Sequence, residues 1–98
     1  MIAVRQTEAY ARWIAGLGDD RARARIEVRI YRLSLGNPGD IRPVGEGISE
    51  IRVDYDPGYR IYLTQRSKAV VILLCGGDKR TQSKDIAAAK ALARQLKE

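Results

Sequence analysis

The stretch "ISEIRVDYDPGYRIYLTQ" (48–65) decides the fold, because apolar and polar residues alternate on both sides of a turn signal. Such alternation is typical of strands with one buried face, and "DPG" between them predicts a hairpin. A three-residue turn fixes which residues face one another across the hairpin. The expected pairs are Tyr55 with Tyr59, Asp54 with Arg60, Val53 with Ile61, and Arg52 with Tyr62. Glu50 then joins the arginines on an open charged face, and the apolar face is expected to lie under helices.

The stretch "VVILLCGGDKR" (70–80) follows and predicts an interior strand that ends in a glycine turn. Its first six residues are apolar on both faces, as a strand covered on both sides requires. The two glycines let the backbone turn sharply. Because this strand runs back along the hairpin, Lys79 and Arg80 are expected at the end of the sheet where Arg60 lies.

The remaining elements follow from the same patterns. Strands are expected at 2–6 and at 41–45, the latter at a sheet edge because Pro43 would disrupt an interior strand. Two helices are expected between Thr7 and the breaker "GNPGD" (36–40), separated at "GLGDD". A third helix, capped by Thr81 or Ser83, is expected to run to about Lys97. The order β-α-α-β-β-β-β-α predicts one α+β domain over 1–98: a small antiparallel sheet with two N-terminal helices packed on one face and a C-terminal helix.

Composition favours an anionic partner and excludes several classes of enzyme. The chain has 18 Lys and Arg against 12 Asp and Glu, a net charge of +6, and residues 51–98 carry most of the excess. It has no histidine, which excludes Ser-His-Asp and Cys-His catalysis and nearly all zinc sites. The one cysteine, Cys75, is expected to be a small buried residue. No apolar run is long enough to span a bilayer and no signal peptide is evident, so we expect a cytoplasmic protein.

The cluster of Arg52, Arg60 and Lys79 suits a phosphodiester substrate, because arginine and lysine stabilise charge on phosphorus without a metal ion. A plain cross-strand ladder of salt bridges remains an alternative for the two strand arginines. A second basic stripe, in the second helix, is interpreted as a solvated face or a partner surface. Its members are Arg21, Arg25, Arg29 and Arg32.

Two segments, 47–65 and 70–93, resemble the RelE/ParE superfamily of type II toxins, and more narrowly its HigB-like, phage Gp49-like branch of addiction module killer proteins. The resemblance rests on Glu-Ile-Arg at 50–52, Gly-Tyr-Arg at 58–60, and Gly-Gly-Asp-Lys at 76–79. It implies the fold derived above. It further implies an mRNA endonuclease that cuts translated mRNA on the ribosome without a metal or cofactor, neutralised by an antitoxin that is often of the helix-turn-helix type.

By position, the resemblance assigns Arg52 and Arg60 to the scissile phosphate and Lys79 to catalysis. Further substrate contacts are expected from Tyr59, Tyr62, Arg80, Gln82 and Lys84. Some relatives place a tyrosine or histidine after the last strand, where this chain has Thr81 and Gln82. The general acid and base are therefore not assigned, and the candidates are Lys79, Lys84 and Tyr59.

Two other functions remain open at this level. ParE-like relatives share the fold and inhibit DNA gyrase by binding it. A basic RNA-binding module without activity of its own is the third possibility. The shared face of Glu50, Arg52 and Arg60 favours RNA cleavage.

Overall fold

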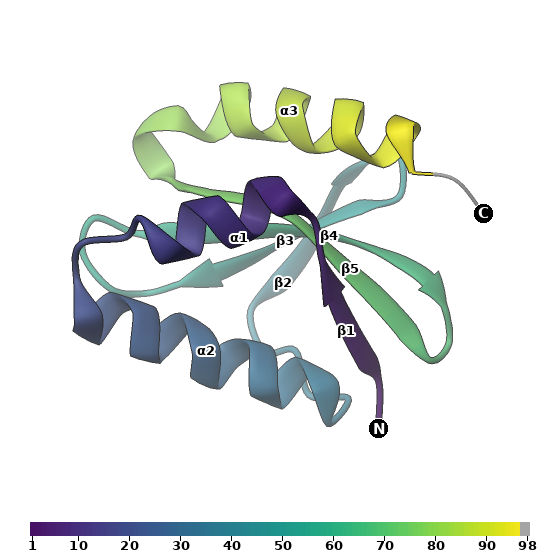
Figure 1. Ribbon diagram of the computed structural model, residues 1–98, viewed down its shortest axis with the longest axis horizontal. Helices are drawn as coiled ribbons and strands as arrows, with labels where there is room; N and C mark the ends of the chain where they lie inside the picture. The colour runs from purple at the N-terminus through teal and green to yellow at the C-terminus, as the bar shows by residue number, and fades with distance from the viewer. Residues whose placement is uncertain (97–98) are drawn as a thin grey trace.

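The computed structural model describes residues 1–96 and shows the predicted order of elements (Figure 1). The strands are β1 (Ala3–Gln6), β2 (Ile41–Gly45), β3 (Ile48–Val53), β4 (Tyr59–Ser67) and β5 (Val70–Asp78). The helices are α1 (Glu8–Ala15), α2 (Asp20–Ser34), the 3-10 turn η1 (Lys79–Thr81) and α3 (Gln82–Gln95). The third helix was expected to run to about Lys97, which lies outside the described residues. No helix in the described part of the chain is long and apolar enough to cross a membrane.

The five strands form one sheet in the order β1-β5-β4-β3-β2. The pairs β2–β3, β3–β4 and β4–β5 are antiparallel, whereas β1 pairs with β5 in parallel. The predictions of an interior strand at 70–75 and an edge strand at 41–45 are confirmed, since β5 lies between β1 and β4 and β2 has a neighbour on one side only.

Helices cover both faces of the sheet, as Figure 1 shows with α2 and α3 on opposite sides. The two N-terminal helices cover the face that carries Ile51 and Ile61, as predicted. The third helix packs instead on the face that carries Ile48 and Tyr62. The expectation that this charged face is open is therefore wrong. The physical reason is that Leu74, in a strand apolar on both faces, also needs a cover there.

The register of the β3–β4 hairpin also differs from the prediction. Arg52 pairs with Arg60 rather than with Tyr62, and Val53 pairs with Tyr59. The cause is the loop 54–58, which takes five residues instead of three. Because the pairing moves by two positions, every side chain stays on the face that was predicted for it.

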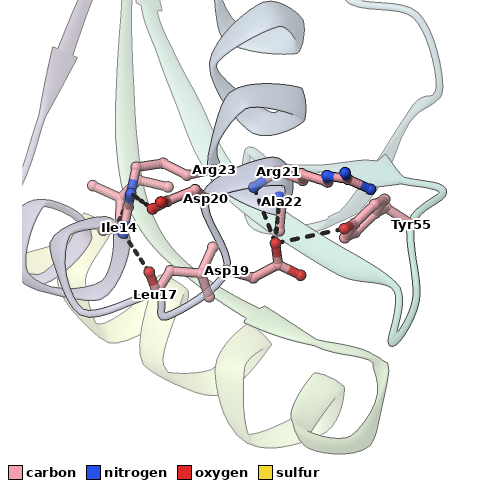
Figure 2. A network of polar contacts seen from close by, with 8 residues as sticks. All are labelled: Ile14, Leu17, Asp19, Asp20, Arg21, Ala22, Arg23 and Tyr55. Carbon is pink, nitrogen blue, oxygen red and sulfur yellow. Dashed lines mark hydrogen bonds and ion pairs between the residues drawn. The ribbon is translucent and has the colours of Figure 1, made fainter.

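Side-chain hydrogen bonds fix the start of α2 against the hairpin loop (Figure 2). The Asp19 carboxylate accepts hydrogen bonds from the backbone N–H groups of Arg21 and Ala22, which makes it the N-cap of α2. The same oxygen accepts a bond of 3.5 Å from the Tyr55 hydroxyl. Nearby, the Arg23 guanidinium bonds to two backbone carbonyl groups at the end of α1. The loop that borders the site described next is thus tied to α2 through Tyr55.

Candidate functional site

A pocket of about 390 Å³ opens at the end of the β3–β4 hairpin. It brings together all three residues that were predicted to be catalytic, Arg52, Arg60 and Lys79, together with Tyr59. The remaining lining residues are Asp40, Val53, Asp54 and Gly58. Three cationic side chains against two acidic ones leave the pocket with a positive balance that suits an anionic ligand.

Strand pairing explains why these cations meet. Arg52 and Arg60 are direct partners across β3 and β4. Farther along, Arg60 pairs with Gly77 and Tyr59 with Asp78, so that Lys79 leaves β5 beside the hairpin loop. The backbone N–H of Lys79 donates a 3.0 Å hydrogen bond to the carbonyl group of Gly58. The predicted convergence of Lys79 and Arg60 at one end of the sheet is confirmed.

Two glycines at the end of β5 permit this close packing. A Cβ atom on Gly76 would lie 2.4 Å from the Trp13 ring, on the side of α1. A Cβ atom on Gly77 would lie 1.8 Å from the Asp85 carboxylate, on the side of α3. Each glycine therefore leaves room for a side chain from a different helix. From the sequence alone, the two glycines were interpreted only as residues that let the backbone turn.

Arg29 supports the wall of the pocket from α2. Its guanidinium donates hydrogen bonds to the carbonyl oxygens of Arg52 at 2.6 Å and Pro38 at 3.1 Å, and it also reaches that of Asp40. These bonds join α2 to the end of β3 and to the segment that precedes β2. Arg29 thus departs from the basic stripe to which the sequence assigned it, because its side chain satisfies backbone carbonyl groups.

A buried carboxylate lies behind Arg60. Glu50 is fully buried, and its Oε2 atom lies 3.7 Å from Nη1 of Arg60, whose side chain is 11% exposed. The same oxygen accepts hydrogen bonds from the Tyr62 hydroxyl at 3.1 Å and from Nε2 of Gln82 at 2.8 Å. Buried charges need such partners, because water no longer solvates them. Glu50 therefore ties Arg60 to the first residue of α3.

The prediction of Tyr62 as a substrate contact is wrong, because its ring is fully buried and its hydroxyl is used by Glu50. Gln82 is likewise engaged with Glu50, and it does not line the pocket. Arg80 lies next to the pocket residue Lys79, but its guanidinium pairs with Asp78 at 2.8 Å. The hydrogen bond from Arg80 lowers the pKa of Asp78. Lys84 is exposed on α3, away from the pocket lining.

Two titratable groups near the site are held in their neutral forms. Partial burial, and then the negative charges of Asp19 and Asp78, raise the pKa of Tyr59. Its hydroxyl group is therefore a proton donor at neutral pH. Burial raises the pKa of Cys75 to about 11, and its thiol contacts the carbonyl group of Asp85. The prediction that Cys75 is a small buried residue is confirmed.

Glu50 was expected on the charged face with the arginines, but neither it nor Asp40 or Asp54 was among the predicted catalytic or substrate-binding residues. A signal existed for Glu50, since strict alternation placed its carboxylate on the same face as Arg52 and Arg60. No signal identified Asp40, which lies in a glycine-rich breaker and reaches the pocket only through the β2–β3 pairing. Within residues 1–96, no three His, Cys, Asp or Glu side chains form a group that could hold a metal ion.

Comparison with known proteins places the chain among phage-related proteins. Residues 12–98 match the family described as phage derived protein Gp49-like (DUF891). A Haemophilus influenzae protein, described as an uncharacterized protein, is 50% identical over 95 residues, which cover 97% of this chain and 96% of that one.

Proposed function

The chain belongs to the phage-derived Gp49-like family, which is associated with toxin–antitoxin modules, and from this we propose that it is the toxin of a type II module. We propose further that it is an mRNA endonuclease that cuts translated mRNA on the ribosome. The observation that supports this activity is the pocket that gathers Arg52, Arg60 and Lys79. The proposed partners are mRNA, the ribosome and a cognate antitoxin.

The reaction uses the nucleophile that RNA itself carries. The 2′-hydroxyl loses its proton to solvent and its oxygen bonds to the adjacent phosphorus, while the bond from phosphorus to the 5′-oxygen breaks and that oxygen takes up a proton. The products are a 2′,3′-cyclic phosphate and a free 5′-hydroxyl. Negative charge builds up on the phosphoryl oxygens in the transition state. Arg52 and Arg60 stabilise that charge, and one such preorganised donor contributes about 10²–10³ in rate. The pair is backed by Arg29 and Glu50, which hold the backbone of Arg52 and the side chain of Arg60.

The leaving 5′-oxygen needs a proton, and Tyr59 is our candidate for the donor. It lines the pocket, and its hydroxyl, whose pKa burial raises above the ordinary tyrosine value, carries a proton at neutral pH. Lys79 lines the pocket too and supplies the third positive charge. Lys84 does not line it, so the geometry favours Lys79 over Lys84 for a direct role.

The test is expression without an antitoxin, with growth and the rate of mRNA cleavage as readouts. We expect the wild-type chain to arrest growth and the Lys79→Ala variant to lose about 10²-fold in cleavage rate. Lys68→Ala is the matched control, because Lys68 is an exposed lysine in the β4–β5 turn. A supercoiling assay with purified gyrase tests the ParE-like alternative. Growth arrest by Lys79→Ala at the wild-type level would contradict the proposed site.

A further inference from the structure

The outer face of α2 carries an exposed apolar row. Val28, Tyr31 and Leu35 are 48%, 61% and 52% exposed. Apart from Met1, they are the large apolar residues that stand exposed in the part of the chain that the structure describes. Their spacing of three and four residues places them on one side of the helix and its C-cap. An apolar row that is concentrated on one helix indicates a surface that binds another protein.

Basic residues outnumber acidic ones beside this row on α2. Arg21, Arg25 and Arg32 are all exposed, and helical spacing places them on the same side as Val28. Glu27, four residues before Tyr31, is the one exposed acidic residue of α2 at the edge of this row, and it also lines a separate hollow with residues of α1 and β1. We call the residues of this outer face the α2 surface: Arg21, Arg25, Val28, Tyr31, Arg32 and Leu35.

A groove of about 490 Å³ runs beside the α2 surface. Arg25, Val28 and Arg32 form one wall, and Val53 and Asp54 of the hairpin form the other. The last two residues also line the pocket with the catalytic cations. A segment bound along α2 would therefore reach the wall of the candidate active site.

We propose that the α2 surface binds an acidic amphipathic helical segment of the antitoxin, with a row of apolar side chains over Val28 and Leu35 and carboxylates facing the arginines. This inference rests on the proposed function, since it takes the partner to be an antitoxin. Charge complementarity requires an acidic segment. A second copy of the same surface would oppose arginine to arginine. RNA would leave the apolar row uncovered.

The first measurement uses two synthetic helical peptides and the full ¹⁵N-labelled chain. Both peptides carry leucine in an i, i+3, i+7 row, one flanked by glutamates and the other by lysines. We expect the acidic peptide to shift the amide signals of α2 and to bind more weakly as salt is added, and the basic peptide to leave them unchanged. Equal binding of both peptides, or shifts confined to other elements, would overturn the proposal.

The second measurement uses the cognate antitoxin of the proposed module and the variants Tyr31→Ser and Arg32→Glu. We expect each variant to bind the antitoxin at least tenfold more weakly than the wild type, with unchanged thermal unfolding, because both side chains are exposed. Lys68→Glu, a charge reversal remote from α2, is the control and should bind as the wild type does. Undiminished binding by both α2 variants would refute the proposal.

Growth assays separate this proposal from the proposed function. Both α2 variants should still arrest growth without antitoxin, since neither residue lines the active-site pocket. A wild-type chain that does not arrest growth would contradict the toxin function, whatever the peptides show. A toxic wild type whose antitoxin binds the α2 variants normally would contradict only the α2 surface.

Discussion

Glu50 and Arg60 are diagonal neighbours on β3 and β4, with the buried carboxylate oxygen of Glu50 3.7 Å from Nη1 of Arg60. The distance is long for a direct hydrogen bond, and within residues 1–96 the Nε of Arg60 and the Oε1 of Glu50 have no hydrogen-bond partner. The guanidinium is thus held by charge more than by a fixed bond, and it also lines the pocket. In this account Glu50 is a positioning residue, which keeps Arg60 in place without contacting RNA.

Glu50→Gln tests this relationship. The amide keeps the shape of the side chain but removes the charge that offsets Arg60, so we expect the free energy of unfolding to fall by about 3 kcal/mol. RNA cleavage should fall as well, because Arg60 loses its anchor. Denaturant unfolding and a cleavage assay measure the two effects.

The matched control is Glu46→Gln, which alters exposed ion pairs with Lys90 and Arg94. Surface pairs contribute little, so this variant should change stability by less than about 1 kcal/mol. Equal effects of the two substitutions would show that burial of the Glu50 charge has no special role.

Arg60 is best tested by Arg60→Lys rather than by Arg60→Ala. Alanine would leave the Glu50 carboxylate buried without a cation, and the fold itself would suffer. Lysine keeps the charge but lacks the planar fork that binds a phosphate through two parallel bonds. We expect near-native thermal unfolding with cleavage reduced about 10²-fold. Full activity of Arg60→Lys would show that only its charge is needed.

Gly76→Ala should destabilise the fold, because the new methyl group would lie 2.4 Å from the Trp13 ring. Overpacking of this kind costs about 1–3 kcal/mol. Gly77→Ala should cost less, since the Asp85 carboxylate can rotate away, but its 2.5 Å bond from the Thr81 hydroxyl would be lost. Gly18→Ala is the control, because no atom of the described residues, apart from the adjoining residues of the chain, lies within 4 Å of the added group. Thermal unfolding that ranks the three variants otherwise would contradict the packing described here.

The raised pKa of the Cys75 thiol predicts that the folded chain loses stability at alkaline pH. Burial raises the pKa of its thiol from 9.0 to about 11 in the folded chain, so between these values the unfolded state loses a proton that the folded state keeps. The free energy of unfolding should therefore fall as the pH rises from about 9 to 11. Unfolding curves of the wild type and Cys75→Ala measure the effect, which should be shallower in the variant. Tyr10, whose pKa is raised from 10.0 to about 12, adds to the loss from about pH 10 upward, and it does so equally in both proteins.

Much of the fold could be predicted from local patterns, and the failures have physical causes. Alternation in β3 and β4 identified the faces correctly, because strand periodicity survives a shift of two positions. The predicted register was wrong because the backbone geometry of the 54–58 loop sets its length, and the sequence "DPG" does not specify that geometry. The packing of α3 on the charged face was not predicted, because alternation reports only which residues are polar. It does not show that Leu74 must be covered by apolar side chains on that side.

The site shows the same division. Arg52, Arg60 and Lys79 could be placed together because strand pairing alone brings them to one end of the sheet. Tyr62 was assigned to the substrate because it shares their face, yet its burial depends on the position of α3. The inward turn of Arg29 depends on carbonyl groups of Arg52 in β3 and of the 36–40 breaker, which helical spacing does not reveal.

The most direct test of the central claim is a map of cellular RNA 5′ ends shortly after the chain is expressed without its antitoxin. We predict new ends with free 5′-hydroxyl groups inside translated codons, absent when translation is blocked and strongly reduced in the Arg60→Lys and Lys79→Ala variants. Growth arrest with intact mRNA would contradict the account and point to a target such as gyrase.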